Sequence, residues 1–329
     1  MRFLLDDEQR AFARSLDDML SAAGTAAVVR AWAAGDTAPG RALWTRLAEA
    51  GVFALAVPQR HDGLGPLPVE LAVAFTELGR HAVPGPLTET VAAAVFLDRL
   101  GDDAAASAWL PGIASGRTVA SLCVLSEDSP YALDADMADA VLVVDDDTVH
   151  LADGAGPVQP SADPARRLAR PLGGTVLARG PEVAAAAAYA ADAAALMTAA
   201  QALGVGRTLL AETVSYARQR TQFGVAIGSF QAVKHRLADT LIALEFAQPL
   251  IHAAALAVAR DDPACGREIA AAKVAACEAA HTAARSALQI HGALGYTEEL
   301  DLSLWIRKAR ALRSAWGTPA ACRARVLAV

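Results

Sequence analysis

Alanine is the feature of this sequence that most limits its fold. It makes up about a quarter of the chain, well above its share in an average soluble protein. Alanine is the best helix former and is depleted in strands, so the composition predicts a mostly helical chain and argues against an all-β fold. Because 54% of the 329 residues are hydrophobic, the chain has ample apolar surface to bury, which excludes disorder.

Charge and cysteine content exclude further classes of protein. The chain carries 29 basic and 36 acidic residues, and its net charge of −7 disfavours a nucleic-acid partner. The four cysteines are scattered without a CxxC pair, which excludes a disulfide scaffold and favours reduced thiols in the cytoplasm. The first ten residues turn acidic at once and have no long apolar core, so they do not resemble a signal peptide.

One apolar stretch, residues 182–206, is long enough to cross a membrane. It is mostly alanine, which gains little from lipid, and it contains Asp192 and Gln201. We therefore expect a buried helix of a soluble protein here and no membrane span.

The hydrophobic pattern divides the chain into three predicted domains. Residues 1–116 have helical patterns, with Asp6 or Asp7 as the first cap and a Pro/Gly-rich loop, VPQRHDGLGPLP, at 57–68. Residues 117–180 have short β-branched runs and a hairpin signal, VVDDDTVHL, which together predict a small β domain of about five or six strands. Residues 181–329 have helical patterns at 181–218, 230–261, 264–291 and 299–325, which predict a four-helix bundle. The predicted fold is α+β and mostly α.

Common catalytic patterns are missing from the sequence. There is no HExxH, no CxxC and no cluster of histidine with carboxylates, so a metal site lacks support. There is also no GxSxG elbow and no P-loop. Gly204-Val205-Gly206 lacks the third glycine of a dinucleotide fingerprint and falls inside a helical pattern, so we expect a close helix contact there.

The first functional signal is the segment YARQRTQFGVAIGSFQ at residues 216–231. Arg218 and Arg220 stand at a predicted helix end, close to Gln222 and Phe223. Such a cluster can bind a pyrophosphate and the edge of an aromatic ring. The plainer interpretation is two cations at a helix C-terminus, followed by a glycine break.

The second signal is the segment QIHGALGYTEELDLSLWIRKAR at residues 289–310. Gly292 and Gly295 allow a ligand to approach the backbone closely, and Gln289 and Thr297 can form hydrogen bonds with it. The plainer interpretation is again a helix end and a turn between bundle helices.

Taken together, the two segments resemble those of the acyl-CoA dehydrogenase family. The pattern R-x-x-F-G-x-x-I-x-x-F-Q at 220–231 precedes Q-x-H-G-x-x-G-Y-T-x-E at 289–299. The loop at 58–65 is similar to the family's P-x-x-x-G-G-x-G, with Asp62 in place of the first glycine. The resemblance covers nearly the whole chain in the right order. It implies the same three-part layout, FAD bound at a subunit interface, and the α,β-desaturation of an acyl-CoA thioester.

The resemblance also implies roles for individual residues. Arg220 matches the arginine that contacts the pyrophosphate of a neighbouring subunit's FAD. The segment at 289–299 matches the family's segment that contacts the ADP part of FAD. Thr318, in Trp316-Gly317-Thr318, matches a family threonine that lies near the flavin. The implied cofactor-binding residues are Arg220, Gln222, Phe223, Gln231, Gln289, Gly292, Gly295 and Thr318.

The expected catalytic carboxylate is missing. Desaturation needs a base against the weakly acidic α-proton, donors at the thioester oxygen and a flavin that accepts the β-hydride. The family's usual base position holds Trp316, and its alternative position holds Ala194. Glu298 and Glu299 are the acids nearest to a cofactor segment. Either is a candidate for a relocated base, and the plainer interpretation is a helix N-terminus lined with acids.

The predicted β domain also departs from the family. It is short, and it lacks the family's Gly-Ser-Asp turn and the Trp-x-x-Thr stretch that lies against the flavin ring. Residues 125–139 occupy roughly that place.

Three functions stay open on this evidence. In the first, the chain is a subunit of a heteromeric acyl-CoA dehydrogenase, and a partner of the same fold supplies the glutamate and the flavin-ring contacts. Short, Ala-rich relatives that lack the glutamate pair in this way, notably in sterol side-chain breakdown. Alternatively, it is a self-sufficient flavoenzyme, with a relocated base or a substrate that needs none. The third possibility is a flavin-free assembly or acyl-carrier-binding protein of the same fold.

Overall fold

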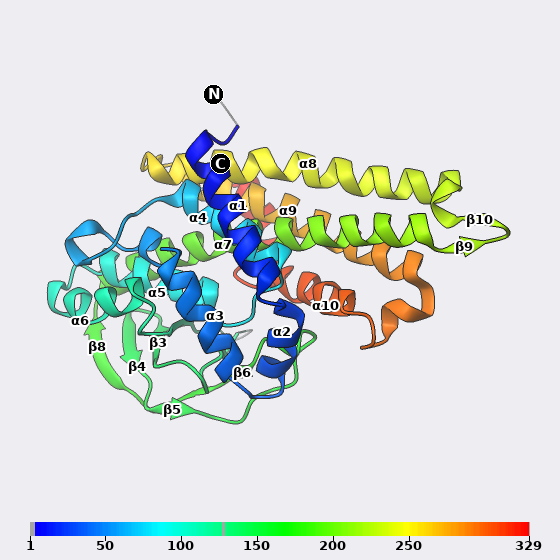
Figure 1. Ribbon diagram of the computed structural model, residues 1–329. Coiled ribbons are helices and arrows are strands. Elements are labelled where there is room, and N and C mark those ends of the chain that lie inside the picture. Colours follow the sequence, from blue (N-terminus) through cyan, green and yellow to red (C-terminus); the bar gives the residue numbers. More distant parts are fainter. Residues whose placement is uncertain (1–3, 127–128, 329) are drawn as a thin grey trace. The chain divides into compact units, whose positions relative to one another are not determined.

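The computed structural model describes residues 4–126 and 129–328, so residues 127–128 of the atypical 125–139 segment lie outside the described part (Figure 1). The chain forms two compact units. Unit 1 holds Met1–Ala26, Ala72–Ala82 and Thr198–Val329, and unit 2 holds Ala27–Leu71 and Val83–Met197. The predicted fold class, α+β and mostly α, is confirmed. The three domains read from the sequence do not coincide with these two units and stay a prediction.

The N-terminal helices follow from local signals. Asp6 caps α1 by accepting a hydrogen bond from the Gln9 N–H, and the Gln9 side chain accepts one from the Asp6 N–H, which completes a capping box. Asp102 caps α6 in a similar way. The helices of this part are α1 (Asp7–Ala22), α2 (Thr25–Ala33), α3 (Ala38–Glu49), α4 (Pro68–Arg80), α5 (Leu87–Arg99) and α6 (Asp103–Ala114).

The loop between α3 and α4 explains the departure at Asp62. This residue has φ 63°, in the left-handed region that favours glycine and that aspartate tolerates better than most residues. A Cβ at Gly63 would lie 1.8 Å from the Val57 carbonyl oxygen, so the following glycine is required by close backbone contact. Asp62 thus keeps the turn without the glycine of the family pattern.

Unit 2 contains a four-stranded sheet in the order β1-β3-β4-β8. Strand β1 (Ala120–Val124) pairs with β3 (Ala140–Asp145) in parallel, and β4 (Thr148–Leu151) pairs antiparallel with β3 and with β8 (Thr175–Arg179). The predicted hairpin is confirmed as β3–β4. The sequence prediction counted too few strands because four are only two residues long: β2 (Ala132–Leu133), β5 (Gly154–Ala155), β6 (Leu168–Ala169) and β7 (Pro171–Leu172).

A buried carboxyl group lies beside this sheet. Asp134 is fully buried at φ 51°, its Oδ1 accepts a 2.9 Å hydrogen bond from Trp32 Nε1, and its Oδ2 has no partner in the described part of the chain. Burial raises the pKa of Asp134 to about 8, and the nearby Glu89 adds to the rise. The group is therefore mostly protonated in the folded protein at neutral pH.

Unit 1 contains the long helices of the C-terminal part. They are α7 (Pro181–Gln219), of which the residues from Thr198 belong to this unit, α8 (Gln231–Ala259), α9 (Cys265–His291), α10 (Leu302–Leu312) and α11 (Pro319–Leu327). The single helix predicted over 299–325 is wrong. It is broken because Trp316 and Gly317 have φ values of 52° and 122°, and Thr318 then caps a new helix that starts with Pro319.

Glycines set the close crossing of α4 and α7. A Cβ at Gly79 would lie 2.0 Å from the Gln201 carbonyl oxygen, and a Cβ at Gly204 would lie 1.9 Å from the Thr76 carbonyl oxygen. A Cβ at Gly206 would meet Leu244 of α8 at 2.5 Å. The expected close helix contact at Gly204-Val205-Gly206 is confirmed, because no side chain fits there.

Two helices, α7 and α8, are long and apolar enough to cross a membrane by length and composition alone. The most apolar window of α7 is 61% buried within the chain, as befits a core helix, whereas that of α8 is only 33% buried. Much of the apolar surface of α8 is therefore left uncovered by its own chain.

We predict that Asp134→Asn flattens the dependence of stability on pH. The folded-state pKa of about 8 lies above the ordinary aspartate value of 3.8, so the stabilisation is fully present below about pH 4 and is lost as the pH rises through 8. Wild-type unfolding free energy should then fall by up to about 1.4 kcal/mol per pH unit within this window. Asparagine keeps an acceptor for Trp32 and tolerates positive φ. Urea unfolding between pH 5 and 8 measures both slopes, and equal slopes would contradict the prediction.

Candidate cofactor-binding site

The segment with the paired arginines folds into a short hairpin at the end of α7. Strand β9 (Thr221–Gln222) pairs antiparallel with β10 (Val225–Ala226), and the Ile227 N–H donates to the Arg220 carbonyl oxygen at 2.8 Å. The two turn residues, Phe223 and Gly224, have φ values of 53° and 78°, the backbone of a type I′ turn. Figure 1 shows this hairpin beyond the ends of α7 and α8.

Phe223 occupies this turn at a cost in backbone energy. An aromatic residue is a genuine outlier at positive φ, where glycine and asparagine are preferred. Its side chain is 92% exposed and meets Phe230 edge to face, with ring centroids 6.4 Å apart. An exposed ring on a strained backbone contributes little to the stability of its own chain. Phe223 is therefore a candidate for contact with another molecule.

Arg220 projects from the start of the hairpin with its guanidinium available. Its side chain is exposed and forms no hydrogen bond or ion pair with any residue in the described ranges. Gln222 and Gln231 are exposed beside it, Gln231 as the first residue of α8. A free guanidinium with amide neighbours suits a phosphate or pyrophosphate group, which it can bind through two parallel hydrogen bonds.

Two contacts bring the second segment to the same end of the helices. Arg236 of α8 donates from Nη1 to Oε1 of Gln289 in α9. The ring of Tyr216 in α7 stacks on that of His291 with centroids 4.2 Å apart, and His291 Nδ1 lies 2.8 Å from the Ala287 carbonyl oxygen. The two predicted segments, far apart in the sequence, therefore lie on adjacent ends of α7, α8 and α9.

Glycine is favoured at two positions of the second segment for different physical reasons. Gly292 ends α9 with φ 59°, and nothing lies within 4 Å of where its Cβ would be, so its main chain is open to a ligand. Gly295 is buried, and its Cβ would press against Leu288 at 3.2 Å. Gly292 therefore fits an approach by a ligand, whereas Gly295 serves packing.

The two positions that the resemblance assigns to the base hold Ala194 and Trp316. Ala194 is fully buried in α7, and Trp316 is half-buried in the turn between α10 and α11. Thr318 uses its hydroxyl to cap α11, accepting from the Ala321 N–H at 3.2 Å. No described contact joins Thr318 to Arg220 or Gln289.

The two candidate acids near the second segment are poorly placed for a base. Glu298 and Glu299 are both exposed, and Glu298 pairs with Arg307 at 3.1 Å. A base that removes a weakly acidic proton needs a dry setting that raises its pKa toward neutrality. These exposed carboxylates have no such setting within their own chain.

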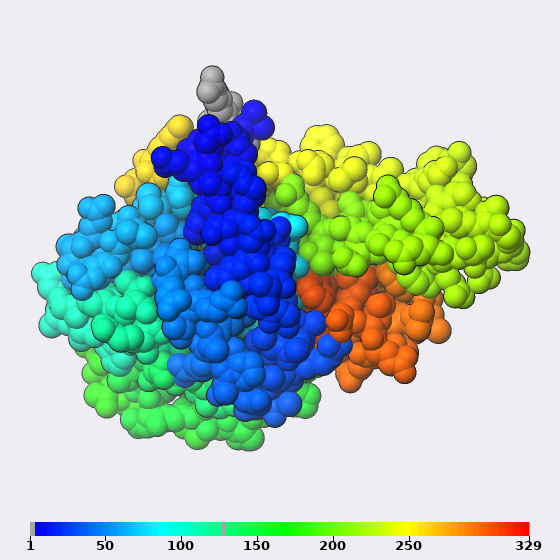
Figure 2. Space-filling model, in the orientation of Figure 1, coloured from blue at the N-terminus to red at the C-terminus, as the bar shows by residue number. Residues whose placement is uncertain are grey.

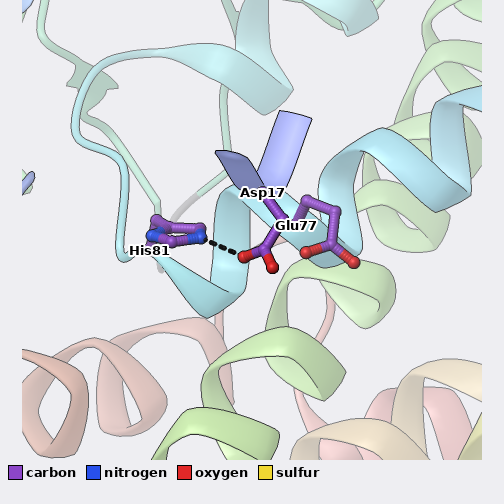
Figure 3. Close-up of side chains that lie close together, drawn as sticks. All are labelled: Asp17, Glu77 and His81. Carbon is purple, nitrogen blue, oxygen red and sulfur yellow. Dashed lines mark hydrogen bonds and ion pairs between the residues drawn. The ribbon is translucent and has the colours of Figure 1, made fainter. Parts of the chain in front are cut away.

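A second polar cluster, which the sequence analysis missed, joins α1 to α4 in unit 1 (Figure 3). One ligand atom each from Asp17, Glu77 and His81 lies within 4.8 Å of the others, and His81 Nε2 lies 2.7 Å from Asp17 Oδ1. Arg80 Nη1 donates to Glu77 at 2.7 Å and lies 3.3 Å from Asp17. The pKa of Glu77 is raised above its usual value, because the effect of burial outweighs the lowering effect of Arg80. Because Arg80 already pairs with both carboxylates, the cluster is an ion-pair network and not a built metal site.

Two profiles of one protein family match the N-terminal and the C-terminal parts of the chain. The profile of the acyl-CoA dehydrogenase N-terminal domain matches residues 6–117, and that of the acyl-CoA dehydrogenase C-terminal domain matches residues 184–328. The acyl-CoA dehydrogenase IpdE2 of Mycobacterium tuberculosis is 36% identical over 293 residues, which cover 86% of this chain and 85% of that protein.

Solved structures share the fold. The ChsE4–ChsE5 complex from Mycobacterium tuberculosis contains a chain that matches 99% of this one over 98% of its own length, with a TM-score of 0.84 and 24% identity. Butyryl-CoA dehydrogenase from Megasphaera elsdenii has the same TM-score and the same coverage of both chains at 21% identity. At these identities the likeness establishes the architecture alone.

We predict that Phe223→Asn raises the unfolding free energy of the chain by about 0.5–1 kcal/mol, because asparagine tolerates positive φ and the exposed ring loses little packing. Urea unfolding measures the change. Gly224→Ala is the matched control, since its Cβ would enter open space at φ 78° and should cost about 1–2 kcal/mol through the backbone alone. A destabilised Phe223→Asn variant would show that the ring matters to its own chain.

Proposed function

Because the chain belongs to the acyl-CoA dehydrogenase family, we propose that it completes the FAD site of a partner chain in the α,β-desaturation of an acyl-CoA thioester. The observation that carries the proposal is that the chain keeps a cofactor-binding arginine but lacks the family's catalytic carboxylate. Arg220 offers a free guanidinium at an exposed hairpin, while the two positions of the family's base hold Trp316 and Ala194. The chain thus has groups for one side of a cofactor and no carboxylate for the chemistry.

The residues at the hairpin and at the end of α9 suit the ADP side of FAD. The Arg220 guanidinium would hold the pyrophosphate, and the Phe223 ring would lie against an aromatic edge. The Gln289 amide, fixed by Arg236, would hydrogen-bond the adenosine part near the open main chain of Gly292. When bound, FAD supplies the acceptor for the substrate's β-hydride.

The base is proposed to come from the partner. A thioester α-proton is removed by a carboxylate in a water-excluded site, and both acids near the cofactor segment of this chain are exposed. A partner of the same fold that retains the glutamate would supply this group. Arg220, Gln222 and Phe223 would then bind from outside, as parts of a shared site.

The surface of α8 supports a partner of similar fold. Leu241, Ile242 and Phe246 are 47%, 52% and 72% exposed, and in Figure 2 the part of α8 beside α1, in yellow-green to yellow, lies at the surface. Exposed apolar side chains that gather on one helix mark an interaction surface. The same helix begins at Gln231, directly after the hairpin that carries Arg220, so we propose that a chain seated on α8 also meets Arg220.

The substrate class and the compartment follow from the same proposal. The solved ChsE4–ChsE5 structure is a complex of two different chains by its name, which supports pairing with a homologue as the form of assembly. The four cysteines are free thiols, which suits a reducing cytoplasm. We propose a fatty or sterol side-chain acyl-CoA as substrate, and pocket depth within the complex would set the acyl length.

The test is the visible spectrum of the purified protein. We expect a colourless chain alone and a yellow complex, bleached by acyl-CoA, after co-expression with a glutamate-bearing homologue. A yellow chain that is bleached by acyl-CoA without any partner would overturn the proposal in favour of a self-sufficient flavoenzyme. Absence of flavin under both conditions would favour a flavin-free assembly or acyl-carrier-binding protein.

Within the assembled complex, Arg220→Ala should weaken FAD retention by about 10- to 100-fold, because it removes a charge-assisted bidentate contact. FAD released during gel filtration and dilution measures the effect. Arg267→Ala removes an equal charge in the first turn of α9, at the end of that helix opposite Gln289, and should leave retention unchanged. Equal flavin content in both variants would show that the pyrophosphate lies elsewhere.

We predict that Phe246→Asp abolishes co-purification of the partner, because it places a charge in the apolar face of α8. Leu172→Asp is the matched control, since Leu172 is 52% exposed on β7 in unit 2. Affinity capture of the co-expressed pair reports the outcome. A complex that forms equally well with both variants would place the interface on another surface.

A further inference from the structure

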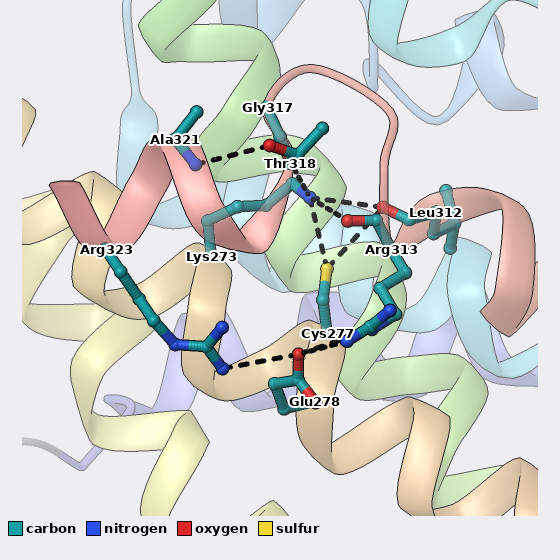
Figure 4. Close-up of polar contacts among 9 residues, drawn as sticks. All are labelled: Lys273, Cys277, Glu278, Leu312, Arg313, Gly317, Thr318, Ala321 and Arg323. Atoms are coloured by element: carbon teal, nitrogen blue, oxygen red, sulfur yellow. Dashed lines mark hydrogen bonds and ion pairs between the residues drawn. The ribbon is translucent and has the colours of Figure 1, made fainter. Parts of the chain in front are cut away.

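The only fully buried basic side chain among the described residues belongs to α9. Lys273 is 1% exposed, and its Nζ lies among neutral groups of α9 and of the connection between α10 and α11 (Figure 4). It donates to the Leu312 carbonyl oxygen at 3.1 Å, the Gly317 carbonyl oxygen at 3.2 Å and Cys277 Sγ at 3.3 Å. The Arg313 carbonyl oxygen at 3.5 Å is the fourth and most distant acceptor.

The position of these acceptors explains how a buried ammonium is tolerated. Leu312 ends α10 and Arg313 follows it, so their carbonyls belong to the helix C-terminus, where oxygens lack intrahelical partners and the dipole is negative. An ammonium has three N–H donors, which three of the four acceptors satisfy while the fourth shares one. The charge is therefore compensated by main-chain dipoles.

The choice of lysine is informative in this sequence. Only three of its 29 basic residues are lysine, namely Lys234, Lys273 and Lys308, and the rest are arginine. A compact ammonium can sit within converging carbonyls, whereas the planar fork of a guanidinium suits flat, paired acceptors. The geometry at residue 273 thus requires the side chain that the protein otherwise avoids.

The same connection is held from its outer side by α9 as well. Glu278, one turn beyond Lys273, accepts from Arg313 through Nη2 at 2.8 Å and Nε at 3.2 Å, and its Oε1 lies 3.4 Å from Arg323 Nη2. Lys273 fixes the carbonyls inside, and Glu278 fixes two arginines outside. Trp316 and Gly317 lie in the sequence between Arg313 and Arg323, and their positive φ values need support from their surroundings.

We propose that Lys273 is a positioning residue, whose ammonium fixes the turn that carries Trp316 and Thr318 and thereby the flavin-side edge of the site. The second part of this inference rests on the proposed function, in which Thr318 lies near the cofactor. Removing the ammonium would leave converging carbonyls buried without a donor, and the turn would open to solvent. The rest of the bundle, which packs through small apolar residues, would stay closed.

The test compares amide hydrogen exchange in the full-length chain. In Lys273→Met, peptides covering residues 312–323 should exchange about tenfold faster than in wild type, while those covering α8 change little. Leu244→Ala, a buried truncation in α8, is the control for general loss of stability. Cys277→Ala keeps the ammonium and its three carbonyls, so it should leave exchange at 312–323 close to wild type. Two results would overturn the proposal: exchange that is faster throughout the chain, or exchange at 312–323 that is no faster than in wild type.

A second variant guards against failure to fold. Lys273→Gln retains two N–H donors without the charge and should give an intermediate exchange rate at 312–323. A Gln variant that behaves like the Met variant, or that exchanges as slowly as wild type, would show that donors at this position do not hold the turn in the way we propose.

The functional part is measured as FAD release from the complex. Lys273→Met should release FAD about tenfold faster, whereas Leu244→Ala, at matched thermal stability, should not. Unchanged release with faster local exchange would overturn the positioning role. If no form of the chain holds FAD, the proposed function fails, and exchange at 312–323 alone then decides whether Lys273 holds the turn.

Discussion

Close approach of helix backbones is the constraint on which unit 1 depends. At the crossing of α4 and α7, Gly79 and Gly204 each face a carbonyl oxygen that a single methyl group would strike. Helices this close are held by many small dispersion contacts between alanines and main chain, since few large side chains fit between them. Alanine therefore sets the spacing of the helices as well as their formation, and it leaves few interior positions where a polar side chain could do chemistry.

Several buried polar groups are satisfied by the backbone, although others, such as Asp134 Oδ2, have no partner among the described residues. Lys273 is held by three carbonyl oxygens, and Thr213 donates to the Leu209 carbonyl oxygen within its own helix. The polar groups at the hairpin are the reverse case, because Arg220 has no partner in the described part of the chain. An exposed guanidinium without a partner in its own chain is available for an anion from outside, as the proposed function requires.

Much of the fold could be predicted because its signals are local. The cap at Asp6, the β3–β4 hairpin and the long helices follow from neighbouring residues. The break between α10 and α11 was missed, although Thr318-Pro319 is a helix-start signal, because the apolar pattern continues across it.

The site was predictable only in part, for a related reason. The resemblance of the two segments named Arg220 and Gln289, but the Arg236–Gln289 contact spans 53 positions and is set by the register of α8 on α9. Lys273 reaches its carbonyls across 39 to 44 positions, and an alanine-rich helix gives no periodic sign of such a reach. Groups defined by tertiary register need coordinates before their partners can be named.

The scarcity of lysine has a chemical consequence for a member of a family that acts on activated acyl groups. Thioesters acylate accessible, neutral amines, and each such event would block a side chain without catalysis. Of the three lysines, Lys273 and Lys308 are 1% and 5% exposed, which leaves Lys234 on α8 as the exposed side-chain amine. Arginine provides positive charge elsewhere and stays protonated, and so it stays unreactive. The described surface of this chain thereby presents few side-chain amines to the class of compound that its family oxidises.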